Sequence, residues 1–529
     1  MSKSLKNISV VAAATMVSRV LGLGRDMLVT AVFGTSALAS AFYTAFTLPN
    51  LFRRLLGEGA LTAALVPTLS DELKTSERTG AFQLVNQVAS WLLVVTGVVV
   101  ILAMTVLWQV PQLAGLWRGW GMEADTFVRL SEAARLAIVL FPYLVLVCLA
   151  AAFSATLQTL HRFLEPALSP IWLNLAMIGL LGGAVYGGWA TAADDRMRWL
   201  CAGALLGGFL QMVVPAAALM AEGWRPRFDL TASPAIKQIV KLMGPTVFGS
   251  AIYLINMAVA RIVGLSLNDS AVTVLNLATR LMELPIGVFA VAVSTVIFPL
   301  ISRYAAAGDQ VNLASAYRKG MRLILVVNVP AAVGLMVLAT PIIRLLFQRG
   351  AFQAEDTALM EPVLATYALG LPFLSFVNLI LRAFYAQKDT VTPVRAAVLS
   401  FVVNLGLSLA LMKPLGTVGL AVAGTVSTVV QAWYLQRKLS RGHEGLHFRH
   451  LARDLVKVLG ASLAMGVVVA GGWAGWILLV PASKAADAIG LAILIGGGVA
   501  VYAGLLWMLR IEGRDELAEI FAKLRQKLT

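Results

Sequence analysis

The sequence predicts an all-α polytopic membrane protein with about fourteen transmembrane helices. The 529 residues are 59% apolar and only 13% charged, with a mean hydropathy of +0.82. Apolar runs of about 20 residues, which is long enough to cross a bilayer, follow one another with short loops between them. Alternation of period two is absent, which excludes a transmembrane barrel.

Each predicted span is an apolar run that ends at a short polar or basic loop. Lys3 and Lys6 before the first run resemble the start of a signal peptide, but Arg19, Arg25 and Asp26 interrupt that run, so we interpret it as a retained span. Residues 511–529 are expected to form an amphipathic tail that lies on the membrane surface. The spans are expected near residues 8–33, 38–69, 83–108, 128–160, 166–189, 198–221, 238–267, 271–302, 321–346, 358–386, 393–412, 417–436, 455–480 and 486–509.

The basic residues fall mostly in alternate loops. By the positive-inside rule this pattern places both termini in the cytoplasm, and an even number of spans requires the same arrangement. The net charge of +15 is therefore explained by membrane topology, and no nucleic-acid partner is expected.

The chain repeats itself at an offset of about 230 residues. Residues 141–144 (Phe-Pro-Tyr-Leu) match residues 371–374 (Leu-Pro-Phe-Leu), and Asn174-Leu175 matches Asn404-Leu405. Each copy holds six spans, so the two lobes should be related by an axis along the membrane normal and should enclose a central cavity. The predicted division is a first lobe at 1–222, a second lobe at 223–440, two further spans that form a lipid-tail groove at 441–510, and the cytoplasmic tail at 511–529.

We select six arginines inside predicted spans, where a charge facing lipid costs roughly 2.5–3.5 kcal/mol on insertion scales. Such residues must be paired or must line a hydrated cavity. Guanidinium groups bind phosphate through two parallel hydrogen bonds, so we expect the cavity to take a phosphate or diphosphate. The six are Arg19, Arg25, Arg53, Arg54, Arg261 and Arg280.

Three acids accompany these arginines. Asp26 follows Arg25 directly, while Glu58 and Glu283 stand four and three residues after Arg54 and Arg280, which is the spacing of a pair along one helix face. Because the arginines outnumber the acids, the cavity should keep a positive surplus. The alternative is a structural role, in which the arginines bond backbone carbonyls or reach the membrane interface.

Other function classes fit less well. A drug or cation antiporter needs an acidic or aromatic cavity, and a membrane-embedded transferase needs carboxylates placed for a metal or a base. A scaffold for partner proteins would not need buried arginines. The sequence contains no phosphate-binding Gly-x-x-x-x-Gly-Lys-Ser/Thr motif and no acidic cluster that would hold magnesium, so neither ATP hydrolysis nor a metal site is expected.

Four motifs resemble those of the MurJ (MviN) lipid II flippase family of the MOP exporter superfamily, and the similarity covers essentially the whole chain. They are Ser18–Asp26, Leu48–Arg54 followed by Glu58-Gly59-Ala60, Arg280–Pro285, and Ala383–Ala386 with Lys388-Asp389-Thr390.

The resemblance implies a fourteen-helix flippase, not an enzyme, in a bacterial inner membrane. It would move lipid II, the undecaprenyl-diphosphate-linked peptidoglycan precursor, from the inner to the outer leaflet by alternating access, and so serve cell-wall biogenesis and cell shape. Another polyprenyl-diphosphate-linked oligosaccharide is the alternative cargo. No cofactor is implied, while coupling to the membrane potential or to a monovalent ion stays open. Expected partners are lipid II, membrane lipids and cell-wall synthesis proteins.

By matching position, the resemblance implies substrate-binding roles for the arginines at 19, 25, 53, 54 and 280. It implies supporting roles for Asp26, Asn50, Glu58, Arg261 and Glu283. One position departs from the family pattern, because many relatives carry an acid where this chain has Ser40.

Overall fold

The computed structural model describes residues 3–53, 61–113, 123–292, 297–441, 444–446, 451–481 and 483–510. Within these ranges the chain is helical and contains no strand. The helices form two compact units. Unit 1 comprises Met1–Thr273 with Arg349–Phe352, and unit 2 comprises Val274–Gln348 with Gln353–Thr529.

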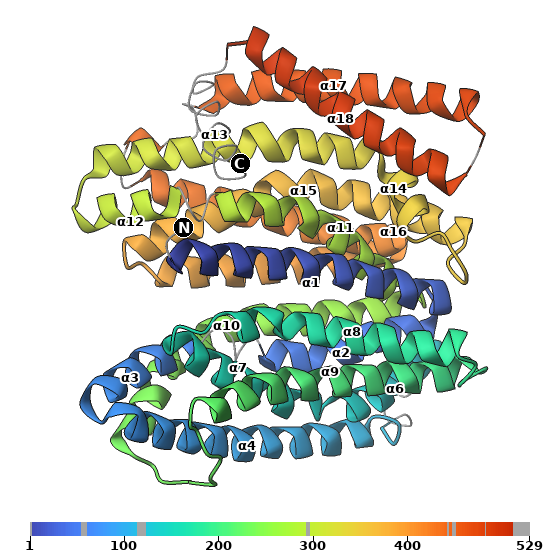
Figure 1. Ribbon diagram of the computed structural model, residues 1–529. Helices are drawn as coiled ribbons and strands as arrows, with labels where there is room; N and C mark the ends of the chain where they lie inside the picture. The colour runs from blue at the N-terminus through green and yellow to red at the C-terminus, as the bar shows by residue number, and fades with distance from the viewer. Residues whose placement is uncertain are drawn as a thin grey trace. The chain divides into compact units, whose positions relative to one another are not determined.

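Unit 1 contains the labelled helices from α1 to α10, which run from blue to green in Figure 1. Two close pairs are α8 with α9 and α1 with α8. One core cluster joins α1, α2, α6, α8 and α9 through small, branched and aromatic side chains. A second cluster packs α3, α4 and α7 together with the start of α10. The helices are α1 (Lys3–Phe33), α2 (Ala37–Arg53), α3 (Thr62–Thr75), α4 (Glu77–Gln109), α6 (Ala124–Leu140), α7 (Tyr143–Thr159), α8 (Leu164–Tyr186), α9 (Ala193–Ala221) and α10 (Pro234–Leu267).

Unit 2 is built around α13, which packs against α15 and α17, while α15 packs along α16. Its helices are α11 (Ala271–Ala292), of which Ala271–Thr273 fall in unit 1, α12 (Phe298–Ala306), α13 (Gln310–Val337), α14 (Ala339–Leu346), α15 (Ala354–Ala386), α16 (Val391–Ser440), the 3-10 turn η3 (Glu444–Leu446), α17 (Ala452–Leu479) and α18 (Lys484–Met508). Figure 1 shows α17 and α18 crossing each other beside α13.

The all-helical membrane fold is confirmed. Among the described residues, eight helices are long and apolar enough to cross a membrane, or nine if α6 and α7, bent by 45° at Phe141-Pro142, form one span. The number is smaller than fourteen because α16 counts once, because α2 and α3 are separate short helices, and because some predicted spans extend beyond the described residues. The predicted span at 38–69 covers α2 and the first half of α3, whereas the span at 321–346 covers most of α13, which is long enough by itself, and then α14. The two predicted spans at 393–412 and 417–436 correspond to two helices that share the label α16 and meet at Gly416, where the backbone leaves the helical region with φ 55° and ψ −137°. They fold back on each other, since Ser400 Oγ lies 3.5 Å from the Ser427 carbonyl oxygen, 27 residues away.

The packing boundary between the units falls at Thr273, whereas the sequence repeat places the lobe boundary at 222. The difference arises because α10 packs against α2, α3, α4 and α6 of unit 1. The lobe division remains a prediction from the repeat.

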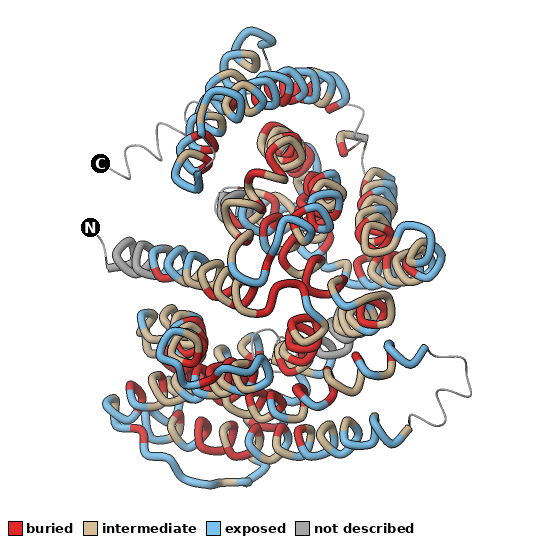
Figure 2. Tube along the Cα trace, turned by 90° about the vertical axis from the view of Figure 1, so that its right-hand side faces the viewer, coloured by how far each residue is buried: buried red, intermediate tan, exposed pale blue. Residues whose placement is uncertain are grey.

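Large apolar side chains are exposed over much of the surface of both units. Figure 2 shows buried positions where neighbouring helices of a unit face each other, and exposed positions along their outward faces. On α17 and α18, for example, Val467, Leu478 and Met508 are more than 70% exposed. A surface of this kind is stable only against lipid, so the chain is a multi-pass membrane protein.

An extended segment, Glu222–Ser233, connects α9 to α10 and is held against α4. The side chain of Asn86 accepts from Trp224 Nε1 at 2.9 Å and donates to the Arg225 carbonyl oxygen at 3.1 Å. One turn later on α4, Ser90 Oγ accepts from the backbone N–H of Asp229 at 2.9 Å. We call this segment the α9–α10 strap. Hydrogen bonds from the side chains of Thr231 and Gln87, the first of them the larger effect, lower the pKa of the Asp229 carboxyl group.

Two ion pairs and one hydrogen bond attach α17 and α18 to the rest of unit 2. Arg322 Nε on α13 lies 2.7 Å from Asp454 on α17, and Arg344 on α14 binds both carboxylate oxygens of Asp487 on α18. Between them, Tyr502 Oη donates to the Val326 carbonyl oxygen at 2.7 Å. That carbonyl lacks its helical donor because the residue four positions later, Pro330, has no N–H.

Candidate functional site

Arg25 is buried in the C-terminal half of α1 and is held by two partners. Its side chain is 8% exposed, and its Nε and Nη2 donate to Asp26 Oδ1 at 3.1 and 2.7 Å. Its Nη1 donates to Asn174 Oδ1 on α8 at 3.1 Å. The carboxylate of Asp26 is fully buried and offsets the charge of the guanidinium, so this predicted phosphate ligand lies within a hydrogen-bonded cluster of unit 1.

Asn174 reaches α1 because the two helices pack closely there. A Cβ atom added to Gly22 would lie 3.7 Å from Asn174 Nδ2, so the amide rests directly on the glycine. Nδ2 donates to the carbonyl oxygens of Ser18 and Pro170 at 3.2 and 3.1 Å. The structure therefore brings together Arg25, Asp26 and Asn174.

Arg53 lies in the last turn of α2 and is partly buried. Its Nε donates to Asn50 Oδ1 at 3.2 Å, and Asn50 Nδ2 donates to the Phe46 carbonyl oxygen at 2.8 Å. That carbonyl lies one turn before Asn50, so the amide lies along its own helix and presents its oxygen to Arg53. Asn50, predicted as a supporting residue, orients the guanidinium of Arg53.

Arg280 and Glu283 form the predicted pair along one helix face, with 3.1 Å between Nη1 and Oε2 on α11 in unit 2. The predicted pairing is confirmed. Both side chains are about half exposed, so solvent screens the pair and leaves the guanidinium accessible.

The remaining sequence-predicted arginines have varied surroundings. Arg19 is exposed on α1, and Arg261 is partly buried on α10, where it donates to the Val272 carbonyl oxygen at 3.4 Å. This contact of Arg261 with a backbone carbonyl is the kind expected of an arginine with a structural role. Arg54 and Glu58 lie outside the described residues.

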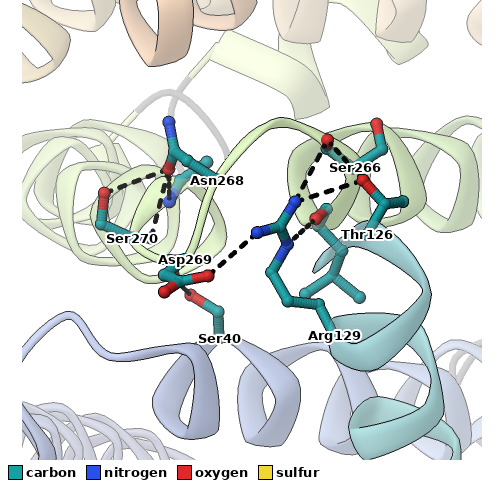
Figure 3. Close-up of polar contacts among 9 residues, drawn as sticks. Ser40, Thr126, Arg129, Ser266, Asn268, Asp269 and Ser270 are labelled. Atoms are coloured by element: carbon teal, nitrogen blue, oxygen red, sulfur yellow. Dashed lines mark hydrogen bonds and ion pairs between the residues drawn. The ribbon is translucent and has the colours of Figure 1, made fainter. Parts of the chain in front are cut away.

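Arg129 on α6 is a buried arginine that the sequence argument did not select. Its guanidinium caps the C-terminal end of α10, with Nε donating to the Leu265 carbonyl oxygen at 2.7 Å and Nη2 lying 3.5 Å from that of Ser266 (Figure 3). Nη2 also donates to Thr126 Oγ1 at 3.2 Å, and Nη1 pairs with Asp269 at 3.1 Å. Its position at the start of a predicted span was a usable signal, since a charge there needs partners.

Ser40 on α2 belongs to the same region of unit 1. Its hydroxyl donates to the Asp269 carbonyl oxygen at 2.5 Å (Figure 3). The same hydroxyl lies 3.0 Å from Thr273 Oγ1. It also accepts from the Thr273 backbone N–H at 3.3 Å. Position 40 thus holds the turn between α10 and α11 through a neutral hydroxyl, while the carboxylate that faces Arg129 comes from Asp269.

A second charged cluster joins the turn between α7 and α8 to the neighbouring helix ends. Arg162 pairs with Glu165 and, at 3.1 Å, with Glu222, which also lies 3.3 Å from Arg78. The hydrogen bond to Glu165 is the main reason why the pKa of Arg162 is raised, and Glu222 adds to it. Three ion pairs join these four residues in a row, so the cluster links the helix ends.

Among the described residues, no group of three or more His, Cys, Asp or Glu side chains could hold a metal ion. The arginines described above can offer hydrogen-bond donors and positive charge to an anion. The acids beside them, Asp26 and Glu283, serve as their partners.

Comparison with known proteins finds relatives that match nearly the whole chain. The family model described as "Lipid II flippase MurJ" matches residues 29–515. The chain is 33% identical over 502 residues to a probable lipid II flippase MurJ from Rhizobium meliloti (strain 1021), covering 94% of this chain and 92% of that protein.

Solved structures agree with this match. The structure titled "Lipid II flippase MurJ, inward closed conformation" aligns with a TM-score of 0.75 at 26% identity, covering 96% of this chain and 99% of the other. An inward-facing multidrug resistance MATE family transporter of the MOP superfamily aligns with a TM-score of 0.63 at 15% identity, covering 80% of this chain and 95% of the other. The second likeness concerns the fold alone.

Proposed function

The chain belongs to the lipid II flippase MurJ family, and on that basis we propose that it carries lipid II across a bacterial inner membrane. It is a transporter and not a catalytic enzyme. The observation that carries the proposal is the match of the family over nearly the whole chain, together with arginines inside predicted spans in both halves of the sequence.

The diphosphate of the cargo is the group that arginines recognise best, because planar guanidinium forks match pairs of phosphate oxygens. Arg53 is partly buried and Arg280 about half exposed, so both can exchange their present contacts for a phosphate. Arg25 is more enclosed and contributes through a fixed orientation. We propose these three as the diphosphate ligands, with Arg19 and Arg54 as further basic residues and Arg261 in support.

Alternating exposure of the site to the two leaflets would move the headgroup while the polyprenyl chain stays in lipid or along α17 and α18. Two negative charges crossing toward the outside gain about 4–5 kcal/mol per 100 mV of membrane potential, negative inside. A bias of this size drives transport without ATP. We propose the membrane potential as the energy source, with a monovalent ion as the alternative, and both termini in the cytoplasm.

The test uses the purified full-length protein in proteoliposomes loaded with lipid II, with exposure on the opposite leaflet measured by an enzyme that modifies only accessible headgroups. Replacing Arg25, Arg53 and Arg280 together with alanine is expected to abolish exposure. Arg135→Ala is the matched control, since Arg135 is an exposed arginine of α6 paired with Glu132. Full activity of the triple variant would contradict the proposed site.

Cargo identity needs a separate experiment. Depletion of the protein in its host should trap lipid II in the inner leaflet, and the wild-type gene should restore its outward exposure. If the depleted cells export lipid II normally and another polyprenyl-diphosphate-linked oligosaccharide accumulates, the alternative cargo is correct.

A further inference from the structure

Asn174 joins α8 to α1 through both polar atoms of its side chain. Nδ2 donates to the Ser18 and Pro170 carbonyl oxygens, and Oδ1 accepts from Arg25 Nη1. The side chain cannot be turned over, since that would set its NH₂ group against the guanidinium, which has no acceptor, and its oxygen against two carbonyls. The amide is only 6% exposed, so its orientation is fixed.

This orientation controls the direction of Arg25. A guanidinium has five N–H donors, of which the bonds to Asp26 use two and the bond to Asn174 uses one. Asp26 binds one edge of the group, at Nε and Nη2, and Asn174 binds the other terminal nitrogen. The two remaining N–H groups belong to the terminal nitrogens, the pair that binds two oxygens of one phosphate.

We propose that Asn174 is a positioning residue, which orients Arg25 toward the diphosphate of the cargo. The inference rests on the proposed function. Asn174 acts through Arg25 and does not itself touch the cargo. Without it, Asp26 still pairs with Arg25, but one terminal nitrogen loses its fixed partner and the guanidinium can rotate about its long side chain.

A purely structural role would be shared by other buried amides of unit 1, and Gln211 on α9 provides the comparison. It is 3% exposed. Its Nε2 donates to the Ser169 carbonyl oxygen at 3.0 Å and its Oε1 accepts from Tyr143 Oη at 3.1 Å. Gln211 therefore joins helices as Asn174 does, but none of these partners is an arginine.

The experiment measures binding of undecaprenyl diphosphate and undecaprenyl monophosphate to the full-length protein in nanodiscs. The variants are Asn174→Leu, Arg25→Ala, their combination, and Gln211→Leu as the control. Leucine has the branched shape of asparagine and lacks its polar atoms, so Asn174→Leu removes the bond to Arg25 with little change in side-chain shape. Gln211→Leu likewise removes the hydrogen bonds of a buried amide. Asn174→Ser, with an oxygen acceptor on a shorter side chain, is the second variant if leucine prevents folding.

Asn174→Leu should weaken diphosphate binding roughly tenfold, which is about the loss of one charge-assisted hydrogen bond between Arg25 and the diphosphate. Monophosphate binding should change less. In the Arg25→Ala background it should cause no further loss, because its effect passes through that arginine. Gln211→Leu should lower thermal stability without changing the preference for diphosphate.

Three results would overturn the inference. They are unchanged diphosphate binding by Asn174→Leu, a loss that adds fully to that of Arg25→Ala, and an equal loss of diphosphate preference in Gln211→Leu. Wild-type protein that binds neither lipid would instead contradict the proposed function itself, so the two failures are distinguishable.

Discussion

Replacing Arg129 with methionine should destabilise unit 1 more than any surface charge change on the same helix. Methionine keeps most of the apolar stem of arginine and removes the guanidinium. The carbonyl oxygens of Leu265 and Ser266, at the end of α10, would lose their capping donor (Figure 3). Carbonyls at a helix end have no partner within the helix, so a buried end without a donor is costly.

The magnitude follows from the bonds that are lost. The bond to the Leu265 carbonyl oxygen, at 2.7 Å, is charge-assisted and contributes about 1.5–3 kcal/mol. The bond to Thr126 contributes about 1 kcal/mol. The Asp269 side chain is 64% exposed, so its ion pair adds no more than about 0.5 kcal/mol. We expect the free energy of unfolding to fall by about 3–4 kcal/mol.

The assay is unfolding in mixed micelles titrated with sodium dodecyl sulfate, followed by tryptophan fluorescence. Arg135→Met is the matched control on α6, because its pair with Glu132 is solvent-exposed and contributes about 0–0.5 kcal/mol. A decrease for Arg129→Met no larger than that for Arg135→Met would refute the capping argument.

Three further predictions use the same unfolding assay. Gly350→Ala should lower the free energy of unfolding more than Gly308→Ala. Both glycines have positive φ, but a Cβ at Gly350 would lie 2.1 Å from a carbonyl oxygen of α1, whereas nothing lies within 4 Å at Gly308. Equal effects of the two substitutions would contradict this prediction. Tyr502→Phe should cost about 1–3 kcal/mol, because a buried carbonyl of α13 loses its donor; wild-type stability would show that the bond contributes nothing. Hydrogen bonds from the Asn312 side chain and backbone lower the pKa of Asp309. Its carboxylate therefore stabilises the start of α13 at any pH above its usual pKa, and this stabilisation is lost as the pH falls through the lowered value. The stability difference between wild type and Asp309→Asn should change only below about pH 4.

Composition and hydropathy were sufficient to predict the helical membrane class, because a run of about 20 apolar residues has few other uses. Local spacing was equally informative for Arg280 and Glu283, whose pairing depends only on helix geometry. The predicted span at 128–160 contains Pro142, and the structure bends there by 45° between α6 and α7.

The partners of the buried arginines could not be predicted from local sequence. Arg25 binds an amide 149 residues away, and Arg129 binds carbonyls that any residue type could supply. Backbone acceptors leave no trace in the side-chain pattern, so their use is set by how the helices pack. Asn174 was visible as half of a repeated Asn-Leu pair, but its contact with Arg25 depends on the approach of α8 to α1 at Gly22.

The α9–α10 strap changes how far α10 can move from α4. A slack linker of its length, about 12 residues, would span roughly 20 Å on average and would let the two helices separate without resistance. The hydrogen bonds from Asn86 and Ser90 hold the strap against α4. If α10 moves, either α4 must move with it or these hydrogen bonds must break. The strap is therefore a poor place to insert a tag or a reporter domain.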